Sequence, residues 1–307
     1  MSRLFVQIKN KDLSTSSNSP NLCVLNCLFF SNSINLPLPN RDNSLGLYNA
    51  FFLFLPSGLT EDVCVIPEIS NRKLGFHVTA DVLRMLKLDM HVHSCFSNDG
   101  IGTPQDLIES LQKRGLQGMA LTDHNTIKGY RSVRTMAQSD FLVIPGVEIS
   151  TADGHLLAIN VTENIQAGLS VEETVERVID AGGEPIVPHL FRLLSGIKKE
   201  KLKAIRTKIS AIEVFNGCSV PNTNLKTAKI AHAFNLGGTG GSDSHDPAFA
   251  GYAYTVVDST DLRIDTVLSE IKRKKTWGEG VTMPLTYRRE RMVLSIRQYV
   301  SRGFKRI

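Results

Sequence analysis

Two histidines and an aspartate in one short stretch of the chain could together bind a metal ion. The stretch Leu88–Gly100 begins as an apolar run, continues through His91-Val92-His93 and ends in a Ser/Asn/Gly turn that carries Asp99. Successive side chains of a β-strand point to opposite faces, so His91 and His93 point the same way. Two imidazoles on one face, with a carboxylate from the next loop, can chelate a divalent cation. Half-buried strand histidines can show the same spacing, so the interpretation depends on further ligands.

Further residues of these kinds occur where other predicted strands end. Asp243 and His245 are again separated by one residue, which repeats the spacing of the first pair. The other ligand-capable residues at or near strand ends are His124, Glu148, His155 and His189. Six of the eight histidines of the chain thus belong to one set. Of the other two, His232 lies in a predicted helix and is interpreted as structural.

Strand-like and helix-like segments that could position these residues alternate from Met85 onwards. The predicted strands are Leu86–His93, Gly118–Thr122, Phe141–Ile149, His155–Val161, Glu184–Val187, Ile209–Phe215, Leu236–Gly241 and Tyr252–Val257. The predicted helices are Thr103–Arg114, Thr126–Gln138, Val171–Ala181, Asn222–Phe234 and Leu262–Lys274. This alternation predicts a mostly parallel sheet. Seven or so strand–helix units in roughly 200 residues fit a closed barrel, in which functional groups lie at the C-terminal ends of the strands.

The predicted donor set suits a particular kind of metal chemistry. Clustered imidazoles and carboxylates favour Mn²⁺, Fe²⁺ or Zn²⁺ over Mg²⁺. Adjacent cations lower the pKa of bound water from 15.7 to about 7, as the hydrolysis of phosphate esters requires. Asp123, directly before His124, is predicted to orient an imidazole, or alternatively to cap a helix. Arg192, three residues after His189, is the candidate for holding a substrate phosphate, with a surface arginine as the alternative.

The motifs around these residues resemble those of the PHP (polymerase and histidinol phosphatase) phosphoesterases. The matching motifs follow the order of that family, and they are His-Val-His-Ser with Asp99, Leu-Thr-Asp-His124, Pro-Gly-Val-Glu148, Gly-His155-Leu-Leu, Pro-His189 and Gly-Ser-Asp243-Ser-His245. The resemblance covers residues 85 to about 280. One departure is that Asn98 separates Ser97 from Asp99, where the family often has Ser-Asp-Gly; Asp99 is still the expected ligand, because Asn98 is neutral.

The resemblance implies a fold and a set of ligands. The implied fold is α/β, a distorted (β/α)7 barrel that holds two or three divalent cations. His91 and His93 would bind one metal with Asp243. Glu148 would bridge to a second metal that also takes His189 and His155. Asp99, His124 and His245 would hold a third.

The ends of the chain differ from this central part. Residues 1–84 contain Ser/Asn/Pro-rich stretches at Ser14–Pro20 and Ser31–Pro39, so a poorly structured extension is expected there, and Met85 is an alternative start of the protein. The PHP-like domain is expected over 85–285. Residues 286–307 are expected to form a basic amphipathic helix, with an apolar stripe at Met292, Ile296, Val300 and Phe304.

Composition narrows the class of protein. The chain has 307 residues, 42% of them hydrophobic and 21% charged, and no apolar run is long enough to span a membrane. Its five cysteines form no C-x-x-C pair, so reduced thiols in a cytoplasmic protein are expected. The net charge of +5 divides into +9 from Lys272 onwards (eleven Lys/Arg against two Glu) and −4 before it. The basic tail indicates an anionic partner such as nucleic acid or an anionic surface, or else a solvated helix packed on the domain by its apolar side.

These observations predict a metal-dependent hydrolase of phosphate esters. The expected substrates are nucleotides or the 5′ ends of oligonucleotides, as for a 5′-3′ exonuclease or a nucleotide phosphatase. One alternative is a phosphatase of the histidinol-phosphate type. Another is a non-catalytic metal-binding or nucleic-acid-associated module, although such modules usually lose ligands and this chain retains the whole set.

Overall fold

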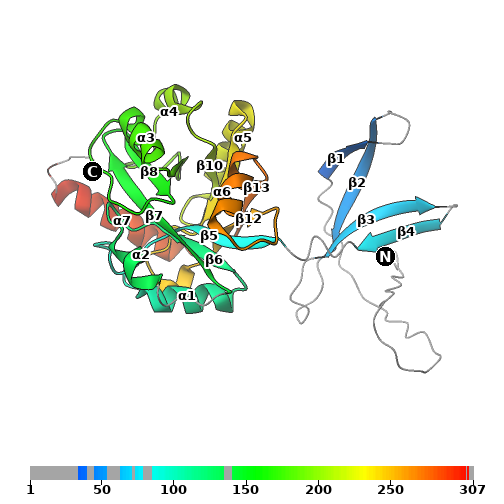
Figure 1. Ribbon diagram of the computed structural model, residues 1–307, viewed down its shortest axis with the longest axis horizontal. Coiled ribbons are helices and arrows are strands. Elements are labelled where there is room, and N and C mark those ends of the chain that lie inside the picture. The colour runs from blue at the N-terminus through cyan, green and yellow to red at the C-terminus, as the bar shows by residue number, and fades with distance from the viewer. Residues whose placement is uncertain are drawn as a thin grey trace. The chain divides into compact units, whose positions relative to one another are not determined.

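The computed structural model of the chain describes residues 34–39, 45–53, 63–70, 73–78, 85–134, 140–301 and 303. Contacts between residues divide the chain into two compact units, Met1–Arg84 and Met85–Ile307. Figure 1 labels the elements of both. All of the predicted ligands belong to the second unit.

The described part of the first unit is a four-stranded antiparallel sheet in the order β1-β2-β3-β4. Its strands are β1 (Ile34–Pro39), β2 (Leu45–Leu53), β3 (Val63–Ser70) and β4 (Lys73–Val78). The sequence predicted no strand over Ser31–Pro39, yet β1 lies there. Asn and Pro are uncommon in strands, so the composition of this segment does not indicate one. Pairing with β2 supplies the hydrogen bonds that stabilise its extended backbone.

The second unit is built on a nine-stranded sheet in the order β11-β10-β9-β8-β7-β6-β5-β12-β13. The strands are β5 (Leu86–Val92), β6 (Gly118–Leu121), β7 (Leu142–Thr151), β8 (Gly154–Ile159), β9 (Glu184–Val187), β10 (Ala211–Asn216), β11 (Gly237–Gly241), β12 (Ala253–Val257) and β13 (Thr276–Gly280). β8 is antiparallel to both β7 and β9, and β12 is antiparallel to both β5 and β13. The other neighbouring pairs are parallel. Seven strands therefore run one way and two run the other.

The predicted fold class is confirmed, since the sheet curls into a nearly closed barrel with helices around it. The strand number differs from the expected seven, because the sheet contains two further strands, β8 and β12, that run antiparallel to the other seven. The antiparallel direction of β8 follows from the short turn that joins it to β7, which ends at Thr151. β13 was not predicted, because Thr-Trp-Gly-Glu-Gly has no run of apolar residues.

Strand β11 brings the two ends of the sheet together. Its sequence, Gly-Gly-Thr-Gly-Gly, leaves almost no side chains between it and its neighbours. The Thr255 hydroxyl of β12 accepts a hydrogen bond from the Gly240 N–H and donates one to the Gly240 carbonyl, both at 2.8 Å. A Cβ on Gly240 would lie 2.3 Å from the Tyr254 carbonyl oxygen. Glycine is therefore required here for the close approach of two backbones.

Seven α-helices are described in the second unit. They are α1 (Pro104–Lys113), α2 (Lys128–Val133), α3 (Val171–Asp180), α4 (Lys199–Ile205), α5 (Pro221–Phe234), α6 (Ile264–Lys272) and α7 (Leu285–Ser301). At the start of α1, Thr103 and Asp106 cap each other's backbone N–H groups, as the Thr-Pro signal indicates. The predicted helix Thr126–Gln138 is shorter in the structure, and its last part falls outside the described residues.

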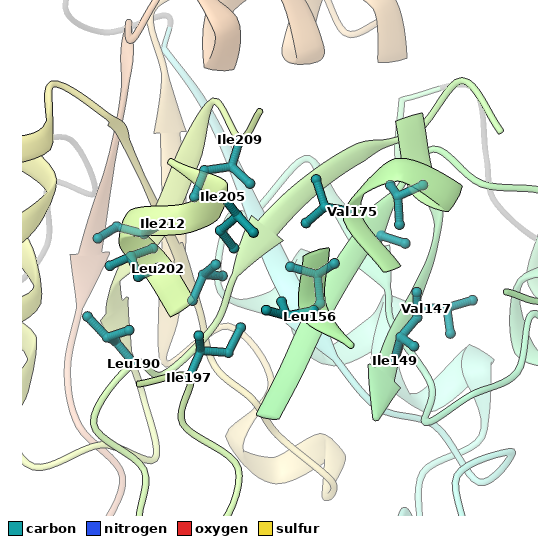
Figure 2. Close-up of a cluster of buried hydrophobic side chains, with 14 of the residues drawn as sticks. Val147, Ile149, Leu156, Val175, Leu190, Ile197, Leu202, Ile205, Ile209 and Ile212 are labelled. Carbon is teal, nitrogen blue, oxygen red and sulfur yellow. The ribbon is translucent and has the colours of Figure 1, made fainter. Parts of the chain in front are cut away.

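Helices α3 and α4 pack on the barrel through apolar side chains. Figure 2 shows one such cluster, in which Val175 of α3 and Leu202 and Ile205 of α4 lie around Leu156 of β8. These four side chains are at most 1% exposed. Burial of each stabilises the fold by about 1.5–3 kcal/mol, so this layer holds the strands at a fixed register. Among the described residues, no helix is both long and apolar enough to cross a membrane.

Candidate metal centre

The barrel brings the nine predicted ligands to one end. His91 lies late in β5 and Glu148 late in β7, while His93, His124, His189, Asp243 and His245 follow strands that run in the same direction. His155 lies at the start of β8, which is the corresponding end because β8 runs the opposite way. Asp99 returns to the site from the loop after β5, with its Oδ1 at 3.5 Å from His245 Nε2. We call these nine residues the metal centre.

The ligand atoms fall into overlapping groups. In each group the candidate ligand atoms lie within 4.8 Å of one another. The groups are His93/His124/His245, His91/His189/Asp243, His91/His93/Glu148 and His124/Glu148/His155. A cation in one group would therefore share ligands with a cation in the next, as expected for a multinuclear site.

Glu148 is the carboxylate on which the imidazoles converge. Its Oε1 lies 2.7 Å from His155 Nδ1 and 2.9 Å from His189 Nε2, and its Oε2 lies 3.0 Å from His124 Nδ1. Burial alone would raise the pKa of Glu148, but the imidazoles of His155, His91 and His124 hold it well below its usual value. The side chain is ionised at neutral pH and can bridge two cations.

Asp243 lies between the histidine pair and an arginine. Its Oδ1 is 3.6 Å from His91 Nε2 and 3.5 Å from His93 Nε2. Its Oδ2 forms an ion pair with Arg192 and accepts a hydrogen bond from Asn216 Nδ2 at 3.1 Å. Burial opposes ionisation, yet Arg192 and His91 hold the pKa of Asp243 well below its usual range. The predicted phosphate-binding Arg192 is thus at the centre, with its side chain 30% exposed.

Two hydrogen bonds determine which nitrogen of His91 and His93 is free. Glu213 Oε1 lies 3.0 Å from His91 Nδ1, so this nitrogen carries the proton and Nε2 is left for a metal. Ser97 Oγ donates its only proton to Asp123 Oδ1 at 2.7 Å, so it can only accept from His93 Nδ1 at 3.3 Å. Both histidines therefore present Nε2 to the centre.

Asp123 is linked to the His93 imidazole through the hydroxyl of Ser97. Its carboxylate accepts hydrogen bonds from the Ser94 N–H, the Ser94 hydroxyl and the Ser97 hydroxyl, each at 2.7 Å. The helix that follows, α2, begins after Ile127, so Asp123 does not cap it. Asp123 thus fixes the loop that carries His93, and Ser97 links it to that imidazole.

Two residues of the site were not found from the sequence. Glu213 is 2% exposed and also accepts the His189 N–H at 2.8 Å. A carboxylate in the apolar strand Ala-Ile-Glu-Val-Phe was the available signal. The second is Arg291 of α7, whose Nη2 donates to Asp99 Oδ2 at 2.9 Å. No local pattern distinguishes Arg291 from the other arginines of that helix.

The C-terminal helix contacts the barrel through its polar side, unlike the alternative in which its apolar side packs on the domain. Tyr287 and Arg291 face the metal centre, while Met292 and Val300 are 54% and 51% exposed. Hydrogen bonds join Tyr287 to the His245 backbone and Arg291 to Asp99 on this side of the helix. Phe304, the last residue of the predicted stripe, lies outside the described residues.

The donor set fits divalent cations. Asp99 Oδ1 and His189 Nδ1 are buried and have no hydrogen-bond partner within the described part of the chain. Such atoms are costly to bury unless a ligand satisfies them. Asn98 is exposed, so Asp99 is the residue that this loop contributes. His189 and Asp243 have φ angles of 26° and 55°, a left-handed backbone in which the loops turn sharply after their strands.

The part of the chain that holds this centre is similar to known proteins. Residues 89–216 match the family described as PHP domain, and residues 221–276 match the family described as PHP-associated. An uncharacterised protein of Methanocaldococcus jannaschii is 29% identical over 142 residues, covering 43% of this chain and 82% of that protein. A 5′-3′ exoribonuclease of Haemophilus influenzae is 39% identical over 66 residues, covering 21% of this chain and 24% of the enzyme.

A similar fold occurs among solved structures. A two-domain protein of Bacteroides vulgatus that contains a PHP-like metal-dependent phosphoesterase matches with a TM-score of 0.57 and 21% identity, covering 64% of this chain and 65% of that one. At this identity the match concerns the fold, and the assignment to a family comes from the matched PHP domain and its associated region. The chain belongs to the PHP family and is a metal-dependent phosphoesterase.

Proposed function

We propose that the chain hydrolyses phosphate esters of nucleotides or of the 5′ ends of oligonucleotides. The observation that carries the proposal is the buried or partly buried set of six imidazoles and three carboxylates at one barrel end, with the Arg192 guanidinium among them. Six imidazoles exceed what a structural site for one ion requires. Because the whole predicted ligand set is retained, the proposal of an enzyme is favoured over a non-catalytic module.

The residues would hold two or three ions of Mn²⁺, Fe²⁺ or Zn²⁺. Nitrogen ligands favour these ions over Mg²⁺. Bound cations of this kind acidify water and neutralise charge on the oxygens of a phosphate ester. The groups that share Glu148 support more than one ion. The identity and number of ions are part of the proposal.

The protein's own residues orient the reactants. Glu213 and Ser97 hold His91 and His93 in the tautomer with a free Nε2. Arg192 uses part of its guanidinium for Asp243 and is partly exposed, so its remaining N–H groups can bind a phosphate oxygen. Asn216 donates to the same oxygen of Asp243 that pairs with Arg192, which leaves the other oxygen beside His91 and His93.

The proposal is tested by offering several esters in parallel to the purified protein with Mn²⁺. They are a 5′-phosphorylated oligonucleotide, a 3′,5′-bisphosphonucleotide and histidinol phosphate. We expect turnover of one or both nucleotide substrates and its loss after chelation. Preferred turnover of histidinol phosphate would replace the nucleotide assignment with the small-molecule alternative. Metal binding without hydrolysis of any ester would contradict the proposal.

A further inference from the structure

A cavity of about 410 Å³ adjoins the metal centre on the side of Asp99 and His245. Its other walls are formed by residues of α7 and of two loops. Tyr287 and Arg291 of α7 line one side, and Ile101 and Phe249 belong to loops that face them. Figure 1 shows α7 as the last helix of the chain. The cavity thus joins metal ligands to a helix that follows the whole barrel in sequence.

Arg291 brings a guanidinium into this cavity, whose lining also includes the carboxylates of Asp99, Asp246 and Glu290. Its Nη2 donates to Asp99 Oδ2 at 2.9 Å and its Nη1 lies 3.3 Å from the Asp99 carbonyl oxygen. Two of the five N–H groups of a guanidinium are used in this way. The side chain is 20% exposed and lines the cavity, so its remaining N–H groups can bind an anion beside the centre.

Another part of the cavity is apolar and aromatic. The rings of Phe249 and Tyr287 lie 4.3 Å apart between centroids. Ile101 is 71% exposed at the edge of the cavity. A cavity of this size, with a guanidinium and several carboxylates in one part and aromatic and aliphatic side chains in another, suits a single small organic ligand.

We infer that α7 completes the substrate-binding site, with Arg291 binding a phosphate oxygen and the wall of Ile101, Phe249 and Tyr287 contacting an aromatic base. The inference rests on the proposed function and narrows it to a phosphate monoester of the size of one nucleotide. The reacting phosphate lies beside Asp99 and His245, and the base lies toward Ile101. In an oligonucleotide only the terminal nucleotide would occupy this cavity.

The role of Arg291 is tested by Arg291→Gln, with Arg289→Gln as the matched control. Arg289 lies on the same helix and is exposed. Calorimetry with the metal-loaded protein measures the binding of inorganic phosphate and adenosine 5′-monophosphate. We expect Arg291→Gln to weaken both by about tenfold or more and to raise KM more than it lowers kcat, because a charge-assisted bond is lost. Arg289→Gln should match the wild type.

A merely structural role would give a different result. If Arg291 only positions Asp99, Arg291→Gln lowers the affinity for Mn²⁺, and binding of both probes at saturating metal is unchanged. That result would overturn the inference, as would equal effects of the two substitutions. The binding readout does not depend on turnover, so failure of the proposed function, with no ester hydrolysed, is distinguishable from failure of this inference.

The apolar wall is tested by Ile101→Ser, with Leu225→Ser as the control. Both side chains are exposed, at 71% and 59%, so neither substitution threatens the fold, and Leu225 lies on α5. We expect Ile101→Ser to weaken the binding of adenosine 5′-monophosphate several-fold and to leave that of ribose 5-phosphate unchanged. Equal loss for both ligands, or no loss for either, would contradict a base-binding wall.

Discussion

Each imidazole of the metal centre has two nitrogen atoms, and its neighbours decide which of them faces a cation. For His91 the deciding neighbour is Glu213, whose Oε1 lies 3.0 Å from Nδ1. A carboxylate in this position also makes the imidazole a stronger donor to a metal. Glu213 additionally fixes the backbone of His189, so one side chain orients two ligands.

The substitution Glu213→Gln should therefore weaken metal binding while the fold persists. Glutamine keeps the shape and can still accept from His91, but it lacks the charge. We expect the affinity for Mn²⁺ or Zn²⁺ to fall by about 10–100-fold, measured by competition with a chromophoric chelator. The exposed carboxylate Glu200 on α4 provides the control Glu200→Gln. Equal affinities of the two variants would count against an orienting role.

Direct ligands should be more sensitive. Asp243→Asn and His93→Ala are each expected to abolish phosphate ester hydrolysis, because they remove a donor around which several others converge. Thermal unfolding monitored by circular dichroism should show that both variants remain folded. Turnover near that of the wild type in either variant would refute its assignment as a ligand.

Proton release should accompany metal binding. Burial alone would lower the pKa of His91, but Asp243, Glu213 and Glu148 raise it well above 6.5. An imidazolium cannot ligate a metal, so its proton must leave first. Affinity for the metal should therefore keep rising as the pH increases above 6.5, because a smaller fraction of His91 is then protonated. Calorimetry in buffers of different ionisation enthalpy measures the released protons, and an affinity independent of pH from 6.5 to 8 would contradict this.

At the scale of the elements, the approach of β11 to β5 positions the centre. A Cβ on Gly241 would lie 2.3 Å from His91 Cβ and 2.8 Å from Glu213 Oε1. Asp89 helps to hold the two strands together, since its carboxylate accepts the Ser242 N–H at 2.9 Å. Burial raises the pKa of Asp89 to about 7, although the hydrogen bonds from Ser242 and Gly251 oppose this.

Gly241→Ala is thus expected to damage the site more than other changes in the same strand. The added methyl must displace His91 or its strand, so metal affinity should fall together with thermal stability. Gly238→Ala is the comparison, because the three atoms nearest to its Cβ all belong to the side chain of Val214, the nearest at 2.9 Å. Metal titration and thermal unfolding measure the metal affinity and the stability of both variants. A smaller effect for Gly241→Ala than for Gly238→Ala would show that β11 does not set the position of His91.

Elements whose own residues carry a signal could be predicted from the sequence. The buried strands from β5 to β12 and the capped helix α1 are of this kind, and so are the histidines that follow strands. β13 could not be predicted, because its five residues become a strand through pairing with β12. The pairing of Arg291 with Asp99 joins positions 192 residues apart, and the charge of α7 alone could not indicate which arginine makes it.

At the scale of the whole molecule, every residue of the metal centre belongs to the unit Met85–Ile307. The core of that unit is formed by its own strands and helices, for example Leu88, Leu157 and Ile186. We propose that it is an independent domain. Its apolar clusters and its site use residues from β5 through α7.

A protein that comprises only residues 85–307 is therefore expected to fold and to hydrolyse the same esters. Its thermal midpoint should match that of the main unfolding transition of the full chain. Its kcat/KM should equal that of the full chain. Size-exclusion chromatography and metal content provide the controls for aggregation and incomplete loading. An aggregated or metal-free product would contradict the independence of this domain.

The left-handed backbone at His189 and Asp243 has a consequence for how this centre relates to folding. A side chain in that conformation costs roughly 1 kcal/mol relative to glycine, which adopts it freely. Glycine at either position would lower the backbone strain of the loop, but it has no side chain to bind a metal. Metal binding and stability therefore favour different residues at positions 189 and 243. Selection for thermal stability alone would favour the loss of His189 and Asp243, and with them two candidate ligands of the centre.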